Sequence, residues 1–439
     1  MSGIEQILEG INKGRAMYDS VHGSLAPVKE ASGGGNELCL GDNLAYMKEL
    51  LERGYGGAFS LIYIDPPFFT RSSFNASVSV RDAAGASHKV HHLAYDDKFD
   101  RNLEYYIENM TARILMMKDL LADDGLMWIH LDWHSSHYVK LVLDELMGEK
   151  NFVNEIIWQY KSGGSGKRHF ARKHDTILVY SKTPSYRINV PKEKSYNRDR
   201  KPYRFRGVAE YKDDGGWYTL VNMKDVWSID MVGRTSAERT GYATQKPLEL
   251  MRRIVEASTE PGDLAGDFFC GSGSLPEAAH MLGRRWMACD SEEMAAAMSR
   301  RRLKKSGADF TFTRMEAAQP GSGRADVEVI AADPLEDGRC LYKCRLRDFL
   351  PDIDTGSIQM KDRGHVEEAL KADRLQFADH LMIDPDFDGT FESRYIFDAG
   401  DEISFISGGN FAVIVVDSFG REYIAGITGP DDKDGVEQK

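Results

Sequence analysis

An α/β fold is predicted, with a mostly parallel sheet that helices cover on both faces. From Glu37 onward, short apolar segments of the 439-residue chain alternate with amphipathic ones. The apolar segments are nearly continuous, which is typical of strands buried on both sides. The alternation stops at residue 161, resumes near residue 244 and ends near residue 310. These two features indicate one sheet that an insertion splits into two halves.

We expect the elements in the following order. A short N-terminal helix with an apolar face and a glycine-rich linker occupies residues 1–35 and should form an appendage. The first half of the sheet should contain strands at 38–40, 59–64 and 126–131, helices at 44–53, 103–121 and 136–147, and an antiparallel edge pair at 154–160 and 176–181. The second half should contain helices at 247–257 and 276–282, strands at 264–269 and 286–290, and a helix that ends near residue 305.

The chain is long enough for one elaborated domain or for two to three smaller ones. We expect five parts, at residues 1–35, 36–160, 161–243, 244–310 and 325–439. The last part should be mainly β, because strand-like runs occur at 395–397, 403–406, 411–416 and 422–424, with a hairpin turn at 417–420.

The charge is unevenly distributed, although the net charge of −13 would by itself disfavour a nucleic-acid partner. Residues 161–212 contain fifteen Lys and Arg against four Asp and Glu, whereas residues 325–439 contain twelve basic and twenty-six acidic residues. A concentrated basic segment suits phosphate neutralisation, and a solvated surface loop explains the charge equally well.

Composition excludes several classes of protein. With 42% hydrophobic and 28% charged residues, the chain should bury a sizeable core rather than remain disordered. The longest apolar runs are far too short to span a membrane, and the N-terminus has no basic-then-apolar signal, so we expect a cytoplasmic protein. Five scattered cysteines argue against a disulfide framework, and no metal site is predicted.

The first candidate motif is Asp65-Pro66-Pro67-Phe68, directly after an apolar strand. Ligands of a parallel sheet bind at the carboxyl ends of its strands, so this turn should border a cleft. Prolines lack N–H groups, which leaves the carbonyls of Asp65 and Pro66 free to accept hydrogen bonds. A ring amine held by a carboxylate and a carbonyl is drawn towards tetrahedral geometry, and Phe68 could stack on the ring. The alternative is an ordinary proline turn.

The second candidate motif, Asp267-Phe268-Phe269-Cys270-Gly271-Ser272-Gly273, also closes a strand and opens a helix. Two glycines allow a close approach to a cofactor, and a carboxylate beside them can hold a cationic amine. Asp290 ends the next strand, seventeen residues beyond Gly273, where a carboxylate meets ribose hydroxyls in nucleotide-binding βαβ units. The third glycine of a dinucleotide fingerprint is missing, which favours an adenosine with an amino-acid tail.

Together these segments resemble the β-group of amino-DNA methyltransferases over residues 36–305. Further matching segments are Gly41-Asp42-Asn43-Leu44, Thr244-Gln245-Lys246-Pro247, and residues 130–134 and 151–158, which look like the modification subunits of restriction systems. The order, with the tetrapeptide first, the basic insert second and the cofactor motif last, is the permuted order of the β-group.

The resemblance implies a Rossmann-like methyltransferase fold, S-adenosylmethionine as cofactor and DNA as partner. The catalytic parts would be 36–160 and 244–310, with target recognition at 161–243. The flipped base would be held by Asp65, Pro66, Pro67 and Phe68. The cofactor would be bound by Asp42, Gln245, Lys246, Pro247, Asp267, Phe269, Cys270, Gly271, Gly273 and Asp290. DNA would be contacted by Lys161, Lys167, Arg168, Arg172 and Lys173.

Two residues depart from the family pattern. Phe268 replaces the usual proline of the cofactor motif, so the local turn is expected to differ, and Phe68 replaces the more usual tyrosine. An aspartate in the first motif position favours adenine N6 as the target, with cytosine N4 as the alternative. An RNA or protein-glutamine methyltransferase and a silent DNA-binding module are further alternatives, and a homodimer and a restriction subunit are left open as partners.

Other polar residues near the motifs have ordinary interpretations. Trp133, His134 and His137 follow a strand end and could touch substrate, but packed or solvated histidines are more common than catalytic ones. Residues 72–92 are too polar for a core and are predicted to form a mobile loop near the tetrapeptide.

Overall fold

The structure is a computed structural model that describes residues 2–22, 35–70, 73–96, 102–161, 168–233, 235–242, 244–315, 323–387, 391 and 393–428. Its centre is a nine-stranded sheet in the order β11-β6-β7-β5-β2-β12-β13-β1-β14. Every neighbouring pair is parallel except the two that involve β7, which runs antiparallel to β6 and β5. The strands are β1 (Glu37–Leu40), β2 (Phe59–Ile64), β5 (Leu121–Leu131), β6 (Phe152–Gln159), β7 (His174–Ser181), β11 (Val226–Ser228), β12 (Leu264–Asp267), β13 (Arg285–Asp290) and β14 (Thr311–Arg314).

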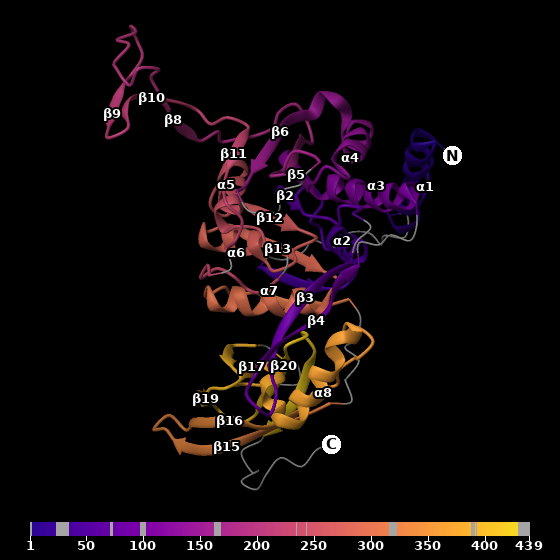
Figure 1. Ribbon diagram of the computed structural model, residues 1–439, viewed down its shortest axis with the longest axis vertical. Coiled ribbons are helices and arrows are strands. Elements are labelled where there is room, and N and C mark those ends of the chain that lie inside the picture. The colour runs from indigo at the N-terminus through magenta and orange to yellow at the C-terminus, as the bar shows by residue number, and fades with distance from the viewer. Residues whose placement is uncertain are drawn as a thin grey trace.

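Helices cover both faces of this sheet, as predicted (Figure 1). One core cluster joins one face to α1 (Gly3–His22), α2 (Asn43–Glu52), α3 (Leu103–Leu120) and α4 (Ser136–Leu143). The other cluster joins the opposite face to α5 (Leu248–Ser258), α6 (Ser274–Met281) and α7 (Glu293–Lys305). A π turn at Asp144–Gly148 and a 3-10 turn at Glu149–Asn151 follow α4. The predicted strand at 59–64 and the antiparallel pairing of β6 with β7 are confirmed, but β11, rather than this pair, forms the edge of the sheet.

The N-terminal helix is not an appendage, contrary to our expectation. Ile7 and Ile11 of α1 are buried in the main core. Gly10 and Gly14 allow α1 to approach α3 so closely that an added Cβ at Gly10 would lie 2.6 Å from the carbonyl oxygen of Glu104. The two helices lie side by side in Figure 1. Glycines on the contact face make this packing possible, and a search for apolar periodicity alone does not register them.

The insert forms an arm that projects from the body of the molecule (Figure 1). It contains a three-stranded sheet of β8 (Lys192–Tyr196), β10 (Gly216–Asn222) and β9 (Tyr211–Asp213), in that order. Several aromatic residues of the arm are exposed to about half their area or more, among them Tyr196, Tyr203, Phe205 and Tyr211. After the arm the chain returns to the main sheet as β11.

The described residues of the C-terminal part form two antiparallel sheets and the helix α8, which confirms that this part is mainly β. The sheets have the orders β15-β16-β19 and β18-β17-β20-β21. Their strands are β15 (Arg324–Pro334), β16 (Cys340–Leu350), β17 (Ala378–Asp384), β18 (Tyr395–Asp398), β19 (Ile403–Ser407), β20 (Phe411–Asp417) and β21 (Glu422–Thr428), and the helix is α8 (Arg363–Ala372), flanked by 3-10 turns at Met360–Asp362 and Arg374–Phe377. The predicted hairpin turn at 417–420 joins β20 to β21.

The segment predicted as a mobile loop is instead a hairpin of β3 (Ser73–Arg81) and β4 (Ser87–Asp96). It runs from the main sheet down to the C-terminal part (Figure 1). Val80 and Val90 are fully buried in the hydrophobic core of that part. The loop prediction was wrong because the apolar partners of these few valines lie after residue 323 of the chain, where no local pattern reveals them.

Candidate active site

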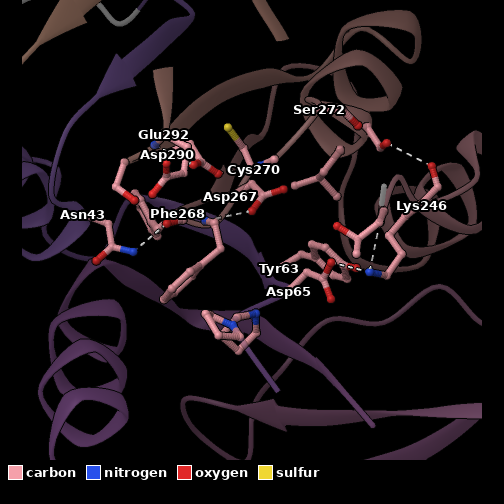
Figure 2. Close-up of a pocket in the computed structure, with 18 of the residues that line it drawn as sticks. Asn43, Tyr63, Asp65, Lys246, Asp267, Phe268, Cys270, Ser272, Asp290 and Glu292 are labelled. Atoms are coloured by element: carbon pink, nitrogen blue, oxygen red, sulfur yellow. Dashed lines mark hydrogen bonds and ion pairs between the residues drawn. The ribbon is translucent and has the colours of Figure 1, made fainter. Parts of the chain in front are cut away.

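A cavity of about 300 Å³ lies at the carboxyl edge of the parallel strands. Residues that follow four neighbouring strands converge on it, namely Asp42 after β1, Asp65 after β2, Asp267 at the end of β12 and Asp290 at the end of β13. Figure 2 shows the last three of these carboxylates around the same space. The predicted tetrapeptide and the predicted cofactor motif, two hundred residues apart in sequence, therefore form one site.

The glycine-rich loop after β12 is held in place from both sides. The Gly271 N–H donates to Asp290 Oδ2 at 2.8 Å, and the Ser299 hydroxyl donates to the Gly271 carbonyl at 2.7 Å. Gly271 and Gly273 have φ angles of 50° and 73°, in the left-handed region that favours glycine. A Cβ at Gly273 would lie 2.8 Å from Ser299 Oγ, so close packing against α7 also demands glycine there.

The side chain of Phe268, which replaces the usual proline, packs into the core beside the cavity. Its ring is fully buried and packs edge-on against Tyr46 and Phe59. Its carbonyl accepts a 2.7 Å hydrogen bond from the Asn43 side chain (Figure 2). Asp267 still faces the cavity, where its Oδ1 accepts the Phe269 N–H at 3.2 Å. The substitution thus leaves the carboxylate in the cavity wall.

Burial changes the acidity of the carboxyl groups at this end of the cavity. Desolvation raises the pKa of Asp267 well above its usual value, and the nearby charges of Asp65 and Asp290 act in the same direction. Burial likewise raises the pKa of Asp290 and of Glu292. A cationic group placed beside Asp267 would offset this cost, so the site suits a ligand with an ammonium group.

At the other end of the cavity, Asp65 faces Lys246, which lies just before α5 (Figure 2). The Lys246 ammonium donates to Asp65 Oδ2 and lies 5.6 Å from the centre of the Phe68 ring. The other carboxylate oxygen, Asp65 Oδ1, is buried and has no hydrogen-bond partner among the described residues. A buried acceptor without a partner is costly, so Oδ1 is suited to receive an N–H from a ligand.

Phe68 lies against a buried polar group that sequence reasoning did not single out. The His130 ring stacks on Phe68 with centroids 6.0 Å apart. His130 lies within 3.0 Å of the Tyr63 hydroxyl at Nδ1 and within 3.2 Å of Asp175 Oδ2 at Nε2. Burial alone would raise the pKa of Asp175, but the hydrogen bond and charge of His130 lower it. Tyr63 lies in the predicted strand directly before the tetrapeptide, whereas Asp175 lies on β7, which is far from β2 in sequence.

A hydrogen-bond chain links the glycine-rich loop to Asp65. The Arg302 guanidinium donates from Nη1 to Ser274 Oγ at 2.9 Å, and this hydroxyl donates to the Lys246 carbonyl at 2.9 Å. Arg302 is itself paired with Glu277. Because the Lys246 ammonium reaches Asp65, the chain connects α7 with the tetrapeptide. Neither Arg302 nor Ser274 was predicted, since an arginine within a helix carries no motif signal.

Most of the predicted site residues line the cavity. They are Asp42, Asp65, Pro66, Pro67, Phe68, Gln245, Lys246, Asp267, Phe269, Cys270, Gly271 and Asp290. Pro247 and Gly273 do not line it and instead cap the N-termini of α5 and α6. The Gln245 amide bonds to the preceding loop, accepting from Thr240 and donating to the Glu238 carbonyl. Residues in the cavity wall that were not predicted include Asn43, Tyr63, Arg113, Tyr242 and Glu292.

The predicted DNA-contacting residues lie in the first part of the insert. Lys161 pairs with Asp230 at 3.4 Å and is largely exposed. Arg168 is exposed, and the Arg172 guanidinium lies 3.8 Å from the centre of the Trp133 ring. Lys167 lies outside the described residues.

A sequence profile described as DNA methylase matches residues 59–301, more than half of the chain. The chain belongs to this family. The methylase is 29% identical over 321 residues to the Type II methyltransferase M.EcaI of Enterobacter cloacae, with 60% of this chain and 68% of that protein covered. It is also 27% identical over 164 residues to the Mod subunit of the Type III restriction-modification enzyme EcoP15I of Escherichia coli, with 35% of this chain and 25% of that protein covered.

Among solved structures, the M1.HpyAVI–SAM complex matches 61% of the methylase and 98% of that chain, with 17% identity and a TM-score of 0.39. The family transfers methyl groups from S-adenosylmethionine, as predicted for the cofactor. In the described part of the methylase, every helix is too short or too polar to cross a bilayer.

Proposed function

We propose that this methylase transfers a methyl group to the exocyclic N6 of an adenine in DNA. The observation that carries the proposal is Asp65 Oδ1, a buried carboxylate oxygen with no partner among the described residues, in the wall of a cavity that the glycine-rich loop also lines. Two N–H groups of a ring amine fit the two acceptors at this turn, Asp65 Oδ1 and the Pro66 carbonyl. Held in this way, the nitrogen lone pair becomes available to an electrophile.

The target base must leave the duplex to reach this turn, because a ring amine inside the base stack is out of reach. Phe68 offers an aromatic face for the extracted base, and His130 supports that ring from beneath at 6.0 Å. Pro66 and Pro67 stiffen the turn, so little ordering is needed when the base arrives. Asp65 therefore acts by positioning the amine and polarising its N–H bonds.

The residues around the glycine-rich loop fit S-adenosylmethionine, which supplies a methyl group already activated on a sulfonium centre when it is bound. Asp267 is placed to hold the amino group of the methionine part, because its buried carboxyl group gains most from a cationic neighbour. Asp290 is placed for the ribose hydroxyls, and Asp42, Phe269, Cys270 and Lys246 line the remaining wall. Gly271 and Gly273 keep the loop free of side chains at its turn.

Cytosine N4 presents the same amine chemistry and is the alternative target. Nucleoside mass spectrometry of DNA from cells that express the protein separates the two, because N6-methyladenine and N4-methylcytosine differ in mass. Sequencing that reports modified bases would then locate the recognition site. Methylated adenine in cells with the wild-type chain, and none with Asp65→Ala, is the expected result. If both modified bases were absent from both samples, the proposal would be overturned.

We further propose that the parts of the chain have the roles that the sequence suggested. Residues 36–160 and 244–310 carry out catalysis and cofactor binding, and residues 161–243 recognise the target, with Lys161, Lys167, Arg168, Arg172 and Lys173 on phosphates. The similarity to a Mod subunit supports a role in restriction and modification, in the cytoplasm where DNA is available. A restriction subunit and a second copy of the chain are the partners to test, by co-purification and by light scattering.

A further inference from the structure

An exposed stack of three planar side chains lies beyond the end of β5. The Trp133 side chain is 45% exposed, although indole is the largest apolar ring in proteins. The Arg172 guanidinium lies 3.8 Å from its ring centroid, and the His134 ring centroid lies 3.6 Å away. His134 is fixed in turn by Asp132, which accepts from its backbone N–H at 2.8 Å and lies 2.6 Å from its Nδ1. The stack is therefore preformed.

The position of this stack relates it to the active site. β5 runs parallel to β2 with Ile129 beside Ile64, so Trp133 and the Asp65–Phe68 turn leave the sheet at the same edge and nearly the same level. His130, three residues before Trp133, already supports Phe68. On its other side β5 pairs with β7, whose start at His174 follows directly on the basic residues 168–173. The stack thus lies between the catalytic turn and the basic start of the insert.

A cation–π pair alone would be weak evidence, since such pairs occur about once per 70–80 residues in proteins. Here Trp133 is left nearly half-exposed, and the charged guanidinium of Arg172 lies on its ring. Both residues lie at the carboxyl edge of the sheet, where a polyanion must approach Asp65. Planar aromatic and guanidinium groups both stack on nucleobases whatever the base, because every base has a π face. An acidic peptide would satisfy the charge of Arg172 but would offer no planar group to stack on its exposed guanidinium.

We propose that Trp133 and Arg172 form a stacking site for a nucleobase of the DNA next to the base held at Asp65. The site supports the DNA strand where extraction of the target base interrupts stacking. This inference rests on DNA as the substrate, and it adds a specific contact that is independent of the catalytic turn. Lys173 and Arg168 then hold phosphates on the same strand, whereas the Arg172 guanidinium, held over the Trp133 ring, stacks on a base.

The test measures binding of the full-length protein to a fluorescent duplex that carries its mapped methylation site, by anisotropy at several salt concentrations. Trp133→Ala should weaken binding about tenfold, in line with the removal of one stacked base. The slope of log Kd against log salt concentration should not change, because no charge is removed. Trp133→Phe should restore most of the affinity, since it keeps an aromatic face.

Arg172→Lys tests whether the two residues act as one unit, because it keeps the charge and removes the planar guanidinium. It should weaken binding with an unchanged salt slope, and the Trp133→Ala/Arg172→Lys double variant should bind no more weakly than Trp133→Ala. Tyr395→Ala is the matched control, because Tyr395 is a similarly exposed aromatic residue (40%) in the C-terminal part. Its DNA binding should equal that of the wild type.

The inference fails if Trp133→Ala binds like the wild type, or if Trp133→Phe binds no better than Trp133→Ala. It also fails if the salt slope falls with Trp133→Ala, which would indicate that the variant has weakened the hold on phosphates. These outcomes can arise while the wild-type protein methylates the duplex normally, so they are distinct from a failure of the proposed function, in which the wild type itself transfers no methyl group.

Discussion

The two oxygens of the Asp65 carboxylate have different surroundings, and this difference underlies the proposed chemistry. Oδ2 is held by the Lys246 ammonium, while Oδ1 is buried without a partner among the described residues. An unsatisfied buried acceptor costs about 1–3 kcal/mol, which a bound amine would recover. The ion pair with Lys246 fixes the orientation of the carboxylate before any ligand arrives.

Replacing Asp65 by alanine should therefore abolish methyl transfer, with a loss of at least about a thousandfold, while cofactor binding survives. Calorimetry with S-adenosylmethionine and a radiolabelled methyl-transfer assay would measure the two effects separately. Asp65→Asn keeps the shape of the side chain and should also be nearly inactive. An amide has no negative charge, and its NH2 group would face the target amine with donors where the carboxylate has an acceptor. Near-normal turnover in either variant would remove Asp65 from the mechanism.

Asp267 should lower the stability of the cofactor-free protein and strengthen the binding of the cofactor. Burial raises its pKa in the folded protein, so this residue favours folding at low pH, and its contribution is lost as the pH rises through the folded pKa. Asp267→Asn places a neutral side chain there, so the variant does not lose stability through ionisation as the pH rises. It should raise the Tm of the cofactor-free protein at pH 8 by about 2 °C. The same variant should bind S-adenosylmethionine at least about tenfold more weakly.

Thermal unfolding of Asp267→Asn and of the wild type at pH 6 and pH 8, each with and without cofactor, tests this expectation. The difference in Tm between variant and wild type without cofactor should be larger at pH 8 than at pH 6. A lower Tm combined with unchanged cofactor affinity would show that Asp267 is a structural residue rather than a ligand of the amine.

Ser274 is expected to position the catalytic ion pair. Its hydroxyl accepts from Arg302 and donates to the Lys246 carbonyl, both at 2.9 Å. Ser274→Ala should lower the single-turnover rate about tenfold while the affinity for the cofactor changes less than about threefold. Ser274→Thr keeps the hydroxyl and should recover most of the rate.

A matched control for Ser274 is Ser258→Ala in α5, because the Ser258 hydroxyl is buried and has no hydrogen-bond partner among the described residues. This variant should transfer methyl groups like the wild type. Equal rates for Ser274→Ala and Ser258→Ala would show that the chain through Ser274 does not influence the reaction.

At the scale of elements, the start of the insert should bind phosphates of the DNA backbone. Changing Arg168, Arg172 and Lys173 together to alanine should weaken DNA binding and reduce the slope of log Kd against log salt concentration by up to about 0.9 for each phosphate that is no longer neutralised. Titrations between about 50 and 200 mM salt would give the slope. An unchanged slope would show that this segment does not bind DNA phosphates.

The matched control removes three cations elsewhere. Lys343, Arg345 and Arg347 lie on β16 and are about half-exposed. Arg345 and Arg347 pair with acidic residues of β15, and Lys343 pairs with Glu402, just before β19. Their triple alanine variant loses the same formal charge far from the carboxyl edge of the main sheet. Its DNA binding should remain close to that of the wild type at every salt concentration.

Elements with their own local signals were predictable from the sequence. The strand at 59–64 is recovered at both ends because it is an uninterrupted apolar run before a proline turn. The hairpin of β3 and β4 was missed because its polar residues alternate with only a few buried ones, and the Asp362 and Gln376 groups that bond to it are distant in sequence. The site motifs were found because each is a contiguous run of characteristic residues. His130, Ser274 and Arg302 were not found, because only the fold brings them to the site.

At the scale of the whole molecule, the described residues of the C-terminal part contact the catalytic part through the β3–β4 hairpin, α7 and β14. The hairpin of β3 and β4 enters its core, where His91 bonds to Asp362. On α7, the buried Arg300 pairs with Glu422 at 2.7 Å, and Arg301 pairs with Asp379. Figure 1 shows the hairpin and α7 facing the C-terminal sheets. The C-terminal part is therefore integral to the fold rather than a detachable addition.

A chain that ends at residue 322 should be strongly destabilised. It would expose Val80 and Val90, and it would leave Arg300 buried without Glu422, a change that typically costs about 3–5 kcal/mol. We expect a Tm at least about 5 °C below that of the full chain. A chain that ends at residue 428 is the control and should unfold like the full chain. Equal Tm values for all three would show that the contacts do not stabilise the protein.

The hairpin has a practical consequence for engineering. Because residues 73–96 complete a core that is otherwise built from residues after 323, the two segments form one folding unit that is interrupted in the sequence. A chimera that borrows either segment alone from another enzyme would bring together surfaces that were never matched. Grafting should succeed only when both segments come from the same donor.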